Sequence, residues 1–147
     1  MNERTITIES NGSKKVYKTR SAHQTHLLAQ KIFKELRGGD VLALSGDLGA
    51  GKTTFVQGLA KALGIAEQIT SPTFVLMKIY ALPKPINNIT QLCHIDAYRL
   101  SSSAELAAIG AVEYIGDAHT LTAVEWPERV SKLIPKNAIV FTFHLFT

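Results

Sequence analysis

Residues 46–53 read GDLGAGKT and match the pattern GxxxxGK[ST]. Glycines let such a loop fold tightly, so that successive backbone N–H groups point inward at phosphate oxygens. The lysine is expected to bridge the β- and γ-phosphates, and the threonine hydroxyl to join the shell of a magnesium ion. The motif therefore predicts a nucleotide site. The residues expected to contact phosphate or magnesium are Asp47, Leu48, Gly49, Ala50, Gly51, Lys52, Thr53 and Thr54.

The residues on either side of the motif have the pattern that such a loop requires. Residues 41–44 form a short continuous apolar run, as expected for a strand that is covered on both faces. After the loop, Phe55, Leu59 and Leu63 recur at helical spacing and predict an amphipathic helix that ends at Gly64. A strand, a glycine-rich loop and a helix in this order are the context that a phosphate-binding loop needs.

The rest of the chain predicts one α/β domain over residues 1–147. Residues 5–8 alternate as a half-buried strand does, and Asn11-Gly12 predicts a hairpin. A helix is expected between Ser21 and the glycines at residues 38–39, and a second between Ser102 and Gly110. A surface turn is expected at the prolines of residues 83–85. Further strands are expected at residues 74–79, 92–95, 121–124 and 138–146.

These elements predict a particular sheet. We expect the sheet of a P-loop NTPase, with a parallel core, an antiparallel N-terminal hairpin, a C-terminal edge strand and helices on both faces. The composition agrees with a folded domain, because 46% of the residues are hydrophobic and 19% are charged. A single cysteine excludes a disulfide framework, and the lack of a leader pattern or a long apolar run predicts a cytoplasmic protein without membrane contact.

Two of the predicted strands end in a carboxylate. Asp96 follows residues 92–95, and Glu125 follows residues 121–124. The carboxyl ends of parallel strands meet at the edge of the sheet where the phosphate loop lies. Because magnesium beside a phosphate is usually held with the help of carboxylates, we expect Asp96 to be the acidic residue in the magnesium shell. Glu125 is expected either to be a second magnesium ligand or to orient the attacking water.

Other candidate residues have a simpler explanation beside the functional one. Thr73, after Ser71-Pro72, is a candidate contact to the γ-phosphate or the metal from a switch-like loop, and an ordinary turn is the alternative. Trp126 is a candidate contact to the nucleotide or a partner, and half-burial is the alternative. His94 lies in a predicted strand, but no pair of histidines has the spacing of metal ligands. Cys93 is most simply a core residue.

Two features bear on the nucleotide and on the class of protein. The NKxD pattern that recognises guanine in GTPases is absent, so elimination favours ATP. A small-molecule kinase would carry the same loop, but such enzymes usually add a lid with several arginines. Only Arg99 and Arg129 occur after residue 37. A kinase is therefore kept as an alternative, together with a non-catalytic module that ATP switches between binding states.

The net charge of +4 is unevenly distributed. Residues 1–37 hold eight lysines and arginines against three acids, which is +5. Residues 91–128 hold one arginine against six acids, which is −5. A basic segment of this kind is compatible with nucleic-acid binding, but a solvated or partner-facing edge is the simpler interpretation.

Four segments, taken in order, resemble the TsaE family. They are GDLGAGKTT at residues 46–54, SPTF at 71–74, HIDAYRL at 94–100 and VEWP at 124–127. The resemblance implies an ATP- and Mg²⁺-dependent ATPase that takes part in the threonylcarbamoyladenosine modification of tRNA. It also implies weak activity alone, stimulation by a TsaB–TsaD heterodimer, and contact with tRNA only through that complex.

The same resemblance implies roles for individual residues. Lys52 would act on the phosphates, and Thr53, Asp96 and Glu125 would surround the magnesium ion. Thr73 would belong to the switch-like loop. The tryptophan that follows the acid in the family corresponds to Trp126, and residues 21–25 become candidate contacts to the adenine.

Overall fold

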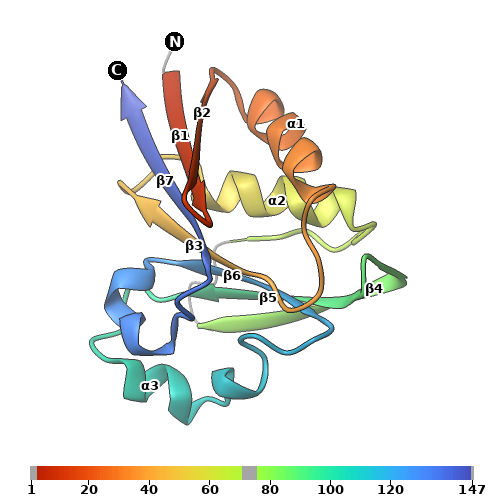
Figure 1. The fold of residues 1–147 in the computed structure, drawn as a ribbon, viewed down its shortest axis with the longest axis vertical. Helices are drawn as coiled ribbons and strands as arrows, with labels where there is room; N and C mark the ends of the chain where they lie inside the picture. The colour runs from red at the N-terminus through yellow and green to blue at the C-terminus, as the bar shows by residue number, and fades with distance from the viewer. Residues whose placement is uncertain (1–2, 71–75, 147) are drawn as a thin grey trace.

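The computed structural model describes residues 3–70 and 76–146, which form one seven-stranded sheet with helices on both faces (Figure 1). The strands are β1 (Glu3–Ser10), β2 (Ser13–Thr19), β3 (Val41–Gly46), β4 (Met77–Ile86), β5 (Ile89–Asp96), β6 (Thr120–Glu125) and β7 (Ile139–Phe146). The α-helices are α1 (Ala22–Phe33), α2 (Lys52–Ala62) and α3 (Ser103–Ala108), and the 3₁₀ helices are η1 (Ala111–Glu113) and η2 (Pro127–Leu133).

The centre of the sheet is parallel, and its two margins are antiparallel. The strand order is β2-β1-β7-β3-β6-β5-β4. β3 pairs in parallel with both β6 and β7, and β5 pairs in parallel with β6. The hairpin of β1 and β2 forms one margin, and β4, antiparallel to β5, forms the other. The predicted α/β class, the parallel core and the N-terminal hairpin are therefore confirmed.

The prediction of a C-terminal edge strand is wrong. β7 lies between β1 and β3 and pairs with both of them, so it is an interior strand. Alternation along residues 138–146 indicates that one face of the strand is buried, and it carries no information about which strands lie beside it. Phe141 and Phe143 supply the buried face, and their rings lie 5.0 and 5.9 Å from that of Phe55 in α2.

The prolines near residue 84 lie in a strand and not in a turn. Pro83 and Pro85 belong to β4, whose pairing with β5 shifts register between Ala81 and Ile86. Because β4 is a margin of the sheet, a missing backbone N–H is tolerated there. The chain turns instead at Asn87 and Asn88, which both have positive φ, a conformation that asparagine tolerates. The predicted strand at residues 74–79 is described from residue 76, and β4 begins at Met77.

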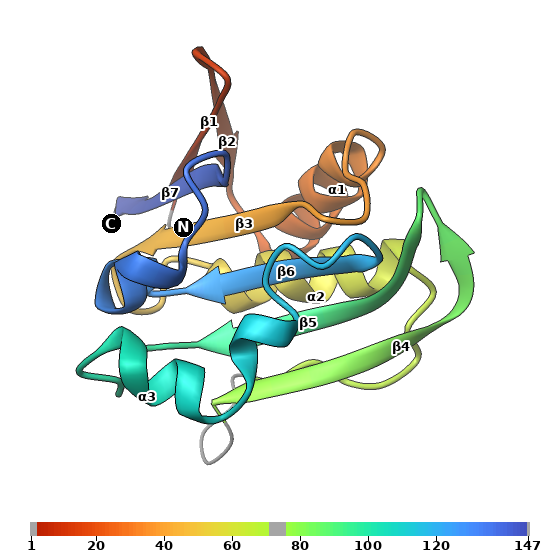
Figure 2. The ribbon, with the colours of Figure 1, turned by 60° about the horizontal axis from the view of Figure 1, so that its bottom comes forward.

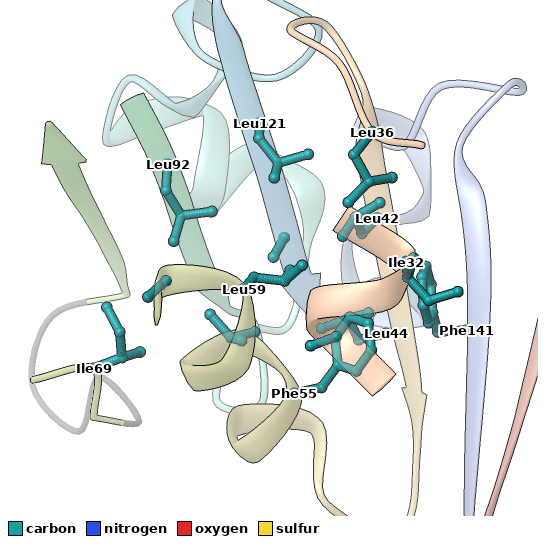
Figure 3. Packing of buried hydrophobic residues seen from close by; sticks show 14 of the residues in the cluster. Ile32, Leu36, Leu42, Leu44, Phe55, Leu59, Ile69, Leu92, Leu121 and Phe141 are labelled. Carbon is teal, nitrogen blue, oxygen red and sulfur yellow. The ribbon is translucent and has the colours of Figure 1, made fainter. Parts of the chain in front are cut away.

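The two faces of the sheet are covered by different helices (Figures 1 and 2), and each face carries its own hydrophobic cluster. Helices α1 and α2 cover one face, and Figure 3 shows their side chains, such as Phe55 and Leu59, packed over Leu42 and Leu121 of the strands. The α1–α2 contact depends on Gly58, because a Cβ there would lie 2.8 Å from the Cβ of Ala29. The packing of α2 against α1 and the sheet holds the start of α2 at the carboxyl end of β3.

The opposite face is covered by α3, η1 and η2. Its cluster includes Val41, Cys93, Val124 and Val130, all of them buried. Burial raises the pKa of the Cys93 thiol to about 12, so this residue is the core side chain that the sequence predicted. Among the described residues, no helix is both long and apolar enough to cross a membrane.

Candidate functional site

A pocket of about 470 Å³ lies at the carboxyl edge of the parallel strands. Its volume is within the usual range of small-ligand sites. Its walls combine the loop residues Leu48, Gly49 and Gly51 with the start of α2 and the ends of β5 and β6. Lys52, Thr53, Thr54, Asp96, Glu125 and Trp126 all line it, so the structure brings together most of the residues predicted for the site. Ala50 is instead fully buried in the core beneath the loop.

The loop between β3 and α2 depends on glycine at defined positions. Gly46, Gly49 and Gly51 all have positive φ, and a Cβ at Gly46 would lie 2.3 Å from the carbonyl oxygen of Phe143. Gly51 leads directly into α2, whose N-terminus has neither a capping side chain nor an acidic residue in its first turn. The amides and the positive end of the helix dipole therefore face the pocket without a capping group from the helix itself.

Lys52 is held inside this loop. Its side chain is buried, and its Nζ donates to the carbonyl oxygens of Gly46 at 2.6 Å and Asp47 at 3.0 Å. The same Nζ lies 4.2 Å from the ring centre of Trp126. Burial lowers the pKa of Lys52, and the charge of Glu125 opposes that shift. The loop thus holds an ammonium group beside the amides of α2, as a phosphate site requires.

Thr53 and Glu125 are in direct contact. The Thr53 hydroxyl lies 3.0 and 2.9 Å from the two carboxylate oxygens of Glu125 and donates its hydrogen there. Glu125 is only 3% exposed and ends β6, the strand that lies beside β3. Because the hydroxyl hydrogen points to Glu125, the lone pairs of the Thr53 oxygen are left for another ligand.

Asp96 lies one strand further from the loop. The register of β5 and β6 pairs Asp96 with Glu125, so the two carboxylates are neighbours at the sheet edge. Asp96 accepts a hydrogen bond from the Tyr98 backbone N–H at 3.0 Å and lines the pocket. Hydroxyl and carboxylate oxygens are the ligands that Mg²⁺ prefers, so Thr53, Asp96 and Glu125 fit the ion that the motif implies.

The site does not resemble a metal centre built from protein ligands alone. Among the described residues, no three histidine, cysteine, aspartate or glutamate side chains gather closely enough to hold a metal ion by themselves. Mg²⁺ at a nucleotide is typically bound by one or two carboxylates together with phosphates and water. The oxygen donors of this pocket fit an ion that shares its ligands with a nucleotide and water.

One residue of the site was missed from the sequence. His94 is fully buried, and its Nε2 lies 2.6 Å from Oε2 of Glu125. The spacing of histidine pairs gives no sign of His94, because its partner is a carboxylate on the neighbouring strand. A better signal is the alternation of β5, because His94 and Asp96 are two residues apart and therefore share one face of the sheet.

Trp126 lies at the mouth of the pocket in a strained conformation. It is half-buried, with φ 60° and ψ 52°, the left-handed region that bulky residues rarely adopt. Such a conformation costs about 1–3 kcal/mol. Its ring lies 4.9 Å from that of Tyr98, another pocket residue that was not singled out from the sequence. The tryptophan is therefore held over Lys52 by the fold.

Some sequence candidates lie elsewhere or cannot be placed. Thr73 falls outside the described residues, so its role stays a prediction. The segment 21–25 begins α1, where Ser21 caps the helix by accepting from the Gln24 N–H, and the Thr25 hydroxyl bonds that of Thr19 at 2.8 Å. These residues do not line the pocket, and their contact with adenine stays a prediction as well.

Comparison with known proteins gives concordant results. The family described as "Threonylcarbamoyl adenosine biosynthesis protein TsaE" matches residues 19–145. A tRNA threonylcarbamoyladenosine biosynthesis protein TsaE from Treponema pallidum is 38% identical over 127 residues, which are 86% of this chain and 89% of the relative. The protein of that name from Bacillus subtilis is 34% identical over 123 residues, 84% of this chain and 73% of the relative. The crystal structure of Bacillus subtilis YdiB superposes with a TM-score of 0.68 at 27% identity, over 98% of this chain and 78% of that one.

Proposed function

The chain belongs to the TsaE family of tRNA threonylcarbamoyladenosine biosynthesis proteins, and from this premise we propose that it binds and hydrolyses MgATP. The observation that carries the proposal is the contact between Thr53 of the GxxxxGK[ST] loop and Glu125 at the end of the adjacent strand. A loop that only makes a turn would need neither this contact nor the buried ammonium of Lys52 beside it.

The residues of the pocket would divide the work as follows. The amides of residues 48–54 and the Nζ of Lys52 would bind the phosphates, with Lys52 exchanging its bonds to the loop carbonyls for phosphate oxygens. Thr53 and Asp96 would hold Mg²⁺, which supplies charge neutralisation at the β- and γ-phosphates. Glu125 would fix the Thr53 hydroxyl and accept a hydrogen bond from the attacking water.

The family assignment also supports a proposal about partners. We expect ATP turnover to be slow in the isolated protein and to rise when a TsaB–TsaD heterodimer binds it, with tRNA contacted through that complex. Since tRNA is modified in the cytoplasm of bacteria, we expect the protein to act there. Tyr98, whose ring contacts that of Trp126 beside the pocket, is exposed and is therefore available for contact with a partner.

The test is phosphate release from ATP with and without purified TsaB–TsaD. We expect the heterodimer to stimulate release, and Lys52→Ala to abolish it. Lys61→Ala is the matched control, because Lys61 lies in the last turn of the same helix and outside the pocket. Transfer of labelled γ-phosphate to a metabolite would favour a kinase instead. Nucleotide binding with no released phosphate under any condition would favour an ATP-switched binding module.

A further inference from the structure

The His94 imidazole makes a buried contact that the phosphate-loop motif does not explain. The residue is fully buried on β5, and its Nε2 lies 2.6 Å from Oε2 of Glu125. A carboxylate can only accept, so the hydrogen of this bond is on Nε2. The other ring nitrogen, Nδ1, makes no hydrogen bond to any residue that the structure describes.

A buried imidazole at this position would destabilise the fold if its only role were to fill space in the core. The ring lies on the same face of the sheet as Leu92 of β5, which belongs to the apolar cluster beneath α1 and α2. A buried polar atom without a partner destabilises the fold, whereas an apolar side chain of similar volume would not. Within the part of the chain that the structure describes, the ring makes its hydrogen bond to Glu125, so the role of His94 lies in what that bond does to the carboxylate.

The Glu125 carboxylate is held from two sides. Thr53 donates from the start of α2, and His94 donates from β5, so the bonds come from elements that flank the end of β6. One donor would leave the carboxylate able to rotate about its last side-chain bonds, whereas donors from two different elements restrict that rotation. The orientation of the Thr53 hydroxyl then follows from that of Glu125.

We propose that His94 is a positioning residue that fixes the Glu125 carboxylate, and through it the Thr53 hydroxyl, for binding of a magnesium–nucleotide complex. The inference rests on the proposed function, because the Thr53 hydroxyl needs a defined direction only if its oxygen binds the ion. Hydrogen-bond partners of metal-binding groups usually change metal affinity or activity by 10- to 100-fold when they are lost. His94 acts through Glu125 and does not itself touch the nucleotide.

The test compares two amide variants of the same residue. In glutamine the amide nitrogen is as many bonds from Cβ as Nε2 is in histidine, so His94→Gln keeps a donor facing Glu125. In asparagine the amide is one bond shorter, so His94→Asn puts a polar group of the same kind out of reach. Thr122→Val is the control, since Thr122 is buried on the face of β6 opposite to Glu125, where its hydroxyl donates to the Tyr114 carbonyl oxygen at 3.5 Å.

The measured quantity is ADP binding in the absence and presence of Mg²⁺, followed by the fluorescence of Trp126, the only tryptophan in the chain. We expect His94→Asn to weaken the Mg²⁺-dependent gain in affinity about tenfold, with little change in magnesium-free binding. His94→Gln and Thr122→Val are expected to stay within about threefold of the wild type. Thermal unfolding of each variant verifies that it is folded.

The possible outcomes separate this inference from the proposed function. A Mg²⁺-dependent gain in the wild type that both His94 variants retain would overturn the role of His94 and leave the proposed function standing. An equal loss in His94→Gln and His94→Asn would also overturn it, because the donor to Glu125 would then be irrelevant. A wild type without any Mg²⁺-dependent binding of nucleotide would overturn both.

Discussion

Charged side chains occupy opposite environments in the pocket beside the glycine-rich loop and on the N-terminal hairpin. Glu125 is 3% exposed and accepts hydrogen bonds from a threonine and a histidine. Glu3 of β1 pairs at the surface with Lys18 and Arg20, whose side chains are 67% and 68% exposed. Buried charges are costly unless they are paired, whereas exposed ion pairs contribute little. The fold therefore buries and orients the charged groups of the pocket, whereas it leaves those of the hairpin in solvent.

The same contrast explains the uneven charge of the chain. The basic surplus of residues 1–37 includes Lys14, Lys15 and Lys18, all of which are exposed on β2. The acidic segment 91–128 contains both carboxylates of the pocket. The net charge of a segment thus indicates where charged residues occur along the chain. It does not indicate which of them the fold buries. The interpretation of the basic segment as a solvated edge agrees with these exposures.

The largest expected effect is on ATP turnover and follows from a change at Glu125, the buried carboxylate of the pocket. Glu125→Gln removes the negative charge and keeps the shape, so it should reduce ATP turnover about 100-fold or more while nucleotide still binds. Phosphate release and Trp126 fluorescence measure the two quantities separately. Glu3→Gln is the matched control and should leave turnover unchanged. Equal turnover in wild type and Glu125→Gln would contradict the role given to this residue.

A second contrast concerns glycine at the phosphate loop and at the hairpin turn. Gly46→Ala should destabilise the protein by about 3 kcal/mol, because its Cβ meets the Phe143 carbonyl oxygen at positive φ. Gly12→Ala should cost about 1 kcal/mol, since Gly12 also has positive φ but has nothing within 4 Å of its Cβ position. Urea unfolding of the two variants measures the difference. Similar costs would show that backbone conformation alone decides both positions.

A third prediction concerns Cys93, a buried group outside the pocket, and the dependence of unfolding free energy on pH. Burial raises the pKa of Cys93 to about 12, so the folded state favours the neutral thiol. This contribution is fully present below pH 9, the ordinary pKa of the thiol, and is lost as pH rises toward 12. Between pH 8 and pH 10, wild type should lose about 1 kcal/mol more unfolding free energy than Cys93→Ala. Identical losses in denaturant titrations at the two pH values would contradict the burial of the thiol.

The smallest expected effect is at the hairpin surface. Glu3→Gln should change the free energy of unfolding by less than about 0.5 kcal/mol at low salt, because its partners are mostly exposed. At high salt, where such pairs are screened, the difference should disappear. Chemical denaturation at two ionic strengths measures both. A cost of several kcal/mol would mean that the hairpin ion pairs are as important as those of the pocket.

Most of the fold could be predicted because its signals are local. The apolar run at residues 41–44, the glycines of the loop and the spacing of Phe55, Leu59 and Leu63 each report on neighbouring residues. The same holds for the start of α1, which was expected after Ser21 and begins there, with the Ser21 side chain accepting from the Gln24 N–H. The place of β7 could not be predicted, because strand order depends on pairing with strands far away in the sequence, about which alternation within one strand says nothing.

The candidate site divides in the same way. The amino-acid sequence was sufficient to place the glycine-rich loop between a strand and a helix, Lys52 and Thr53 within it, and two carboxylates at strand ends, because each follows from residue order along one segment. The bond from Thr53 to Glu125 and the bond from His94 to the same carboxylate join residues 72 and 31 positions apart. Such contacts exist only after α2, β5 and β6 have packed together. Local chemistry can thus be recognised along the chain, whereas the orientation of a buried carboxylate is a property of the packed sheet.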